Sequence, residues 1–165
     1  MNIYITTGTI EFLKRVKEKN PEEKMVLMAK ADGALLFHET AGETVFKQPR
    51  RYEAIESRGE LVDNGYVVMY HIPITDEGRP LFEYQLKVEN WLFGNEPGLY
   101  TLRALRPLSS RAYMIITIWE KETLYEKWQK SNTPLVEKIK NGLGYSQQPS
   151  VFESSPYIQK YTIQE

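Results

Sequence analysis

The sequence predicts an α+β fold made of ferredoxin-like antiparallel sheets that carry their helices on one face. One observation behind this prediction is the order of strand-like and helix-like patterns, which starts again at Gly65. Another is the length of 165 residues, which suits one compact body of two halves better than two full domains. With 41% hydrophobic and 26% charged residues, the chain has the composition of a globular protein that closes a core.

The first half begins with a strand and a helix. Residues 2–6 alternate apolar and polar side chains, as a half-buried strand does. The threonines within residues 7–9 offer capping hydroxyls for a helix, which Pro21 ends. The chain therefore starts with a strand that feeds directly into an amphipathic helix.

A hairpin follows this helix. Asp32 and Gly33 are a strong two-residue turn signal between strands expected at residues 25–29 and 34–38. Beyond Thr40 the chain is more polar, and we expect a short strand at residues 44–46 and a short helical segment at residues 52–57. The first half thus looks like a shortened copy of the second.

The second half repeats the pattern at full length. A strand at residues 66–72 precedes a helix that starts near Thr75, and one stripe of this helix carries Leu81, Tyr84, Val88, Trp91 and Leu92. Two strands follow, at residues 99–105 and 112–119. A second helix starts at about Lys121, and a last strand lies within residues 151–163. This order is the ferredoxin-like one. We therefore predict two related halves, residues 1–64 and 65–165, packed as an internal dimeric-barrel-like unit with a cleft at their junction.

The composition excludes several classes of function. The 21 basic residues nearly balance the 22 acidic ones, so the overall charge attracts neither nucleic acid nor anionic lipid. The chain has no cysteine, which excludes disulfides, thiolate catalysis and cysteine-ligated zinc. Neither a secretory leader nor an apolar run of membrane-spanning length is evident. We expect a cytoplasmic protein without a nucleic-acid or membrane partner.

The segment ITIWEKETLYEKWQKS, residues 116–131, leads from a strand into a helix and holds two of the three tryptophans. Leu124, Tyr125 and Trp128 share one face of that helix. An indole at such spacing packs into a core, or it forms the wall of a pocket for a flat aromatic ligand. The pattern by itself leaves both interpretations open.

The stretches TIWEKETLYEKWQKS, NEPG and LRALRP resemble the antibiotic biosynthesis monooxygenase (ABM) domain. With YITTGTIEFL, LLFHETAGETVF and EGRPLF, the resemblance covers nearly the whole chain and extends to two-domain members that degrade haem. It implies a monooxygenase that opens haem oxidatively. Haem is then both substrate and cofactor, and the protein takes electrons from an external donor.

The resemblance also implies three site positions. The tryptophan that presses on the porphyrin corresponds to Trp128, the asparagine that hydrogen-bonds the distal ligand falls on Tyr70, and the iron-ligating histidine falls on Lys138. A lysine ammonium has no lone pair for iron, so Lys138 is expected to be a solvated residue or a partner for a propionate. Tyr70 could donate a hydrogen bond or ligate iron through its oxygen, or it could fill the pocket and block haem.

The two histidines are alternative iron ligands. By strand alternation His71 points to the opposite face from Tyr70, and His38 ends a hairpin strand where a structural hydrogen bond is expected. Residues 141–156 have the composition of a loop that could act as a lid.

Three hypotheses about function remain open on the sequence. The first is the haem-degrading monooxygenase. The second is a catalytically degenerate binding or stress-regulatory protein, and the third is a cofactor-independent monooxygenase acting on an aromatic small molecule. Since one chain supplies both halves, we expect a monomer or a weak homodimer.

Overall fold

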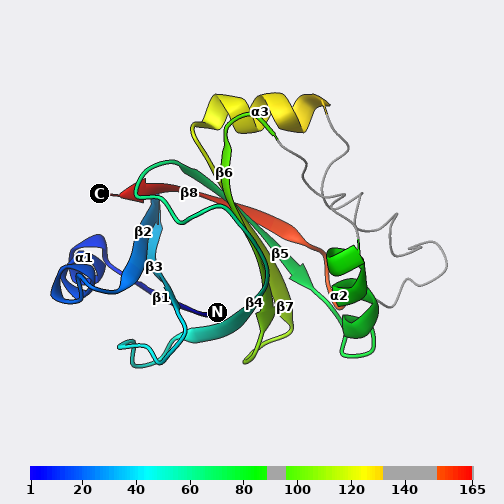
Figure 1. The fold of residues 1–165 in the computed structure, drawn as a ribbon, viewed down its shortest axis with the longest axis horizontal. Coiled ribbons are helices and arrows are strands. Elements are labelled where there is room, and N and C mark those ends of the chain that lie inside the picture. The colour runs from blue at the N-terminus through cyan, green and yellow to red at the C-terminus, as the bar shows by residue number, and fades with distance from the viewer. Residues whose placement is uncertain (89–95, 132–151, 165) are drawn as a thin grey trace.

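The computed structural model describes residues 1–88, 96–131 and 152–164, which form eight strands and three helices. The strands close into one barrel, and the helices lie outside it (Figure 1). In chain order the elements are β1 (Asn2–Gly8), α1 (Ile10–Lys19), β2 (Lys24–Lys30), β3 (Gly33–Thr40), β4 (Arg50–Arg58), β5 (Tyr66–Pro73), α2 (Arg79–Val88), β6 (Leu99–Pro107), β7 (Ala112–Trp119), α3 (Glu122–Ser131) and β8 (Tyr157–Gln164).

The strand order confirms the predicted fold class and the relation between the halves. Around the barrel the strands run β1-β3-β2-β8-β5-β7-β6-β4, and β1 pairs with β4 to close the ring. The first half has the order β4-β1-β3-β2 and the second half the order β8-β5-β7-β6. In both, the strands of the half follow the ferredoxin-like order of fourth, first, third and second. The halves also join edge to edge, through antiparallel pairing of β2 with β8 and of β4 with β6. The boundary between residues 64 and 65 stays a prediction, because one continuous sheet crosses both halves.

Two predictions in the first half are wrong. Residues 52–57, expected to be helical, lie within β4, and residues 44–46, expected to be a strand, lie in the connection from β3 to β4. Pairing with β1 on one side and β6 on the other outweighs the local helix propensity of the two glutamates and the alanine in this segment. A register shift between Ala54 and Glu56 interrupts the alternation that would mark a strand in the sequence.

The buried stripe predicted for α2 is also partly wrong. Tyr84 is 60% exposed, and Phe82 and Leu86 are buried in its place. The helix begins only at Arg79, after a turn in which the Gly78 amide donates to the Thr75 hydroxyl. Trp91 and Leu92 lie outside the described residues.

Three apolar clusters hold the molecule together. One fills the barrel lumen with side chains such as Ile5, Phe37, Met69 and Ile116. The other two cover the outside of the sheet, one beneath α1 and one on the second half, where α2 and α3 lie (Figure 1). Since strand side chains alternate between faces, β5, β6 and β7 each contribute side chains to both the lumen cluster and the outer cluster.

One mouth of the barrel is closed by the segment that connects the halves. Leu61 is 4% exposed and belongs to the lumen cluster. Beside it, the buried Arg103 guanidinium pairs with Glu39 across the barrel, with 2.7 Å between Arg103 Nε and Glu39 Oε1. Along the described ranges, no helix is long and apolar enough to cross a membrane.

Candidate functional site

Trp128 lies at the centre of an aromatic cluster between α3 and the outer face of the second-half sheet. We define this aromatic cluster as Tyr70 of β5, Trp119 of β7, and Tyr125 and Trp128 of α3, all of which belong to one buried core. The ring centroids of Trp119 and Trp128 are 5.5 Å apart, and those of Trp119 and Tyr125 are 5.6 Å apart. Trp128 is only 6% exposed, so most of its indole is packed within the core.

Trp128 also forms the wall of a cavity. This Trp128 cavity has a volume of about 170 Å³, and Leu124, Lys127 and Pro97 line it together with the indole. Its size is below the roughly 300 Å³ at which ligand pockets usually begin. The same side chain is therefore both a core residue and a pocket wall, and the sequence alone did not distinguish the two.

Tyr70 lies inside the aromatic cluster and is only 2% exposed. Burial, followed by the neighbouring Tyr125 hydroxyl, raises the pKa of Tyr70 far above that of a free phenol. Burial likewise raises the pKa of Tyr125. Both side chains are thus neutral phenols near pH 7. In this neutral state each hydroxyl can donate a hydrogen bond.

Neither histidine belongs to the aromatic cluster. His71 is 3% exposed and stacks on Tyr157, with 4.5 Å between ring centroids. Burial, and after it the charge of Arg50, lower the pKa of His71 to about 4, so its imidazole is neutral near pH 7. Its neighbours Tyr70 and Ile72 both lie in the outer cluster, so His71 points to the other face, as strand alternation predicts.

His38 lies in the first half, where it is fully buried. Its Nδ1 is 2.9 Å from the Thr44 hydroxyl oxygen, and its Nε2 is 3.3 Å from Glu23 Oε1. Burial lowers the pKa of His38, against the opposing effect of the Glu23 carboxylate. The Thr44 oxygen also accepts a hydrogen bond from the Phe46 amide, so the imidazole and this amide meet at one hydroxyl. His38 therefore anchors the connection between β3 and β4.

The third position implied by the sequence, Lys138, lies outside the described residues, as does most of the loop at residues 141–156. Within the described ranges, no group of three or more histidine, aspartate or glutamate side chains could hold a metal ion. The structure thus brings Trp128 and Tyr70 together and places both histidines elsewhere.

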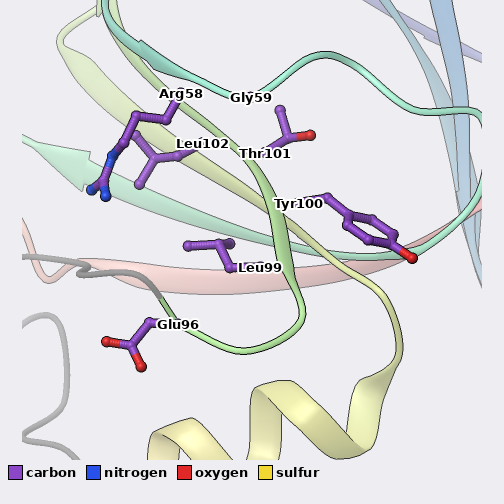
Figure 2. A pocket seen from close by; sticks show the side chains of 7 residues that line it. All are labelled: Arg58, Gly59, Glu96, Leu99, Tyr100, Thr101 and Leu102. Atoms are coloured by element: carbon purple, nitrogen blue, oxygen red, sulfur yellow. The ribbon is translucent and has the colours of Figure 1, made fainter.

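A second cavity lies near the Trp128 cavity, and we call it the Arg58 cavity. It has a volume of about 270 Å³, and Glu96 lines both cavities. Figure 2 shows Leu102 beside the Arg58 side chain and Leu99 at a height between Arg58 and Glu96, while Tyr100 points the other way. The sequence does not reveal this cavity, because Arg58 meets Leu102 only through the pairing of β4 with β6.

Known proteins resemble the chain over most of its length, although no family model matches it. A signal transduction protein TRAP of Staphylococcus aureus is 31% identical over 130 residues, which are 79% of this chain and 78% of that protein. A haem-degrading monooxygenase of Listeria monocytogenes is 28% identical over 139 residues, which are 84% of this chain and 82% of that protein. A Listeria monocytogenes ferredoxin-fold protein, described as related to antibiotic biosynthesis monooxygenases, superposes with a TM-score of 0.77 at 27% identity, covering 99% of this chain and 94% of that one.

Proposed function

Because the chain belongs to the ABM-domain family that includes both haem-degrading and regulatory relatives, we propose that it is a monooxygenase of the haem-degrading type. One observation carries the proposal. Trp128, which the resemblance assigns to the tryptophan that presses on the porphyrin, lines a cavity on the outer face of the second-half sheet. An indole that is held on one side and faces a cavity on the other suits a flat aromatic ligand.

The residues of the aromatic cluster would share the work of binding and orientation. Trp119 and Tyr125 hold the Trp128 indole from behind, at centroid distances of 5.5 and 6.3 Å. An indole fixed in this way would resist a bound macrocycle and distort it. The Tyr70 hydroxyl, which interacts with that of Tyr125, would complete the inner wall of the site.

Haem, when bound, would supply the iron that activates oxygen, with electrons from an external donor. The fit to haem is incomplete among the described residues. No imidazole lies in the aromatic cluster, since His71 faces the lumen and His38 lies in the other half. The Trp128 cavity is also small, so a macrocycle would enter only if its walls move apart.

A second candidate is a binding or regulatory protein that keeps the fold without the chemistry. The burial of Tyr70 favours it, because this side chain, which the resemblance assigns to the distal asparagine, is packed in the core and only 2% exposed. The similarity to TRAP supports it as well. Such a protein would hold a flat ligand, or none, and would not turn it over.

Reduction of the hemin-loaded protein in air separates the two candidates. The monooxygenase should lose its Soret band, in the presence of catalase to remove free peroxide, and release an open-chain tetrapyrrole. Trp128→Phe should slow this loss, whereas Tyr84→Phe, a change at an exposed position on α2, should not. A Soret band that stays constant in the reduced, aerated protein would refute the monooxygenase and leave the binding protein.

A further inference from the structure

We infer that Arg58 anchors a carboxylate of the ligand, so that the site selects flat aromatic compounds that carry a carboxylate over their neutral analogues. The inference rests on the proposed function in one respect, because it takes the Trp128 cavity as the place of the ring system. It adds the chemical class of the ligand and the residue that recognises this class.

The Arg58 cavity and the Trp128 cavity lie on the same side of the sheet. Leu102 is 5% exposed and belongs to the same buried cluster as Trp128, and Leu99 packs against that cluster. Glu96 lines both cavities. An apolar floor therefore leads from the indole toward Arg58, as an amphipathic ligand with an aromatic body and a charged end requires.

The charges at the two edges of this floor set the direction of the ligand. In Figure 2 the Arg58 guanidinium and the Glu96 carboxylate extend to the same side, with Leu102 beside Arg58 and Leu99 at a height between the two charged groups. A guanidinium stays charged at any working pH and binds a carboxylate through two parallel hydrogen bonds. Glu96 repels an anion, so the carboxylate end of a ligand belongs at the Arg58 edge and its apolar body near Glu96 and Trp128.

Buried hydrogen bonds fix the backbone that carries Arg58. Arg103 Nη1 donates to the carbonyl oxygens of Arg58 and Gly59, at 3.0 and 2.9 Å, and the Thr101 hydroxyl donates to the Glu60 carbonyl at 2.5 Å. Arg103 and Thr101 are only 4% and 1% exposed. Because three consecutive carbonyls are held before any ligand arrives, the backbone at this wall of the cavity loses little further freedom on binding.

Glycine at position 59 is required by this arrangement. Gly59 has a φ of +70°, and a Cβ added there would lie 2.0 Å from the Tyr100 carbonyl oxygen. The chain therefore passes very close to β6 directly after Arg58. This contact, together with the Arg103 hydrogen bonds, aligns the end of β4 with the cavity wall.

The test compares hemin with hemin dimethyl ester, in which both carboxylates are neutral, by titration followed at the Soret band. Arg58→Gln should weaken hemin binding about ten-fold, the effect of one charge-assisted hydrogen bond, and leave ester binding unchanged. Arg58→Lys, which keeps the charge but not the two-pronged geometry, should fall between the native protein and Arg58→Gln. Glu96→Gln should strengthen hemin binding, because it removes a repelling charge.

The matched control is Arg51→Gln, an exposed arginine of the same strand whose guanidinium lies 5.6 Å from the Tyr4 ring centroid, in the first half. It should change neither titration. Hemin binding that Arg58→Gln leaves intact, or weakens as much as it weakens ester binding, would overturn the anchor while the proposed function stands. A native protein that binds neither compound would overturn both.

Discussion

Replacing His71 by glutamine should remove part of the acid sensitivity of the fold. The imidazole is 3% exposed and stacks on Tyr157. Burial, and then the charge of Arg50, lower its pKa to about 4, whereas a histidine in an unfolded chain titrates near 6.5. Between these two pH values the unfolded chain binds more protons than the folded one. The free energy of unfolding therefore falls as the pH falls.

The size of this effect follows from the two pKa values. At pH 7 His71 is mostly deprotonated in both the folded and the unfolded state, and its titration lowers the free energy of unfolding by only about 0.2 kcal/mol. At pH 5 the unfolded state is almost fully protonated at this position and the folded state is not, which lowers the free energy of unfolding by about 2 kcal/mol. Glutamine carries no titrating group, so the variant lacks this loss.

Urea unfolding of the native protein and of His71→Gln, measured from pH 7.5 to pH 5, checks the prediction. The two stability curves should converge toward low pH by about 2 kcal/mol relative to their separation at pH 7. His38 also titrates with a lowered pKa, but it is present in both proteins and cancels in the comparison. Parallel curves would refute the reasoning, because they would mean that His71 binds its proton equally in both states.

Three further substitutions probe the site and its supports. Trp128→Ala should lower the free energy of unfolding by about 3 to 5 kcal/mol and abolish haem turnover, as measured by urea unfolding and by loss of the Soret band. Arg103→Gln leaves Glu39 buried without its partner and should cost about 3 kcal/mol in the same unfolding assay. Gly59→Ala forces a Cβ against the Tyr100 carbonyl and should lower the melting temperature measured by circular dichroism.

The alternation and hairpin signals were sufficient to predict most of the sheet. In the second half, the strands that contribute to both the lumen and the outer cluster have a regular apolar sequence pattern. The fold class followed from the order of these strands. The strand β4 was missed because its sequence, RRYEAIESR, has helix-forming residues and a register shift at its centre. Only its neighbours β1 and β6 make it a strand, and a local pattern carries no information about pairing partners from both halves.

The candidate site was predictable where one element carries it. Helical spacing placed Tyr125 and Trp128 on one face, and both are buried there. Strand alternation separated Tyr70 from His71. The Arg58 cavity could not be predicted, because its walls come from β4 and β6. Arg58 and Leu102, which pair across these strands, are more than forty residues apart in the sequence.

The most direct test of the account is a titration of the native protein with hemin, followed at the Soret band. Saturable one-to-one binding with a shifted band is expected for the native protein, and Trp128→Ala should show no such shift. A spectrum no different from that of hemin with an unrelated protein would contradict the central claim that the Trp128 cavity takes a flat aromatic ligand.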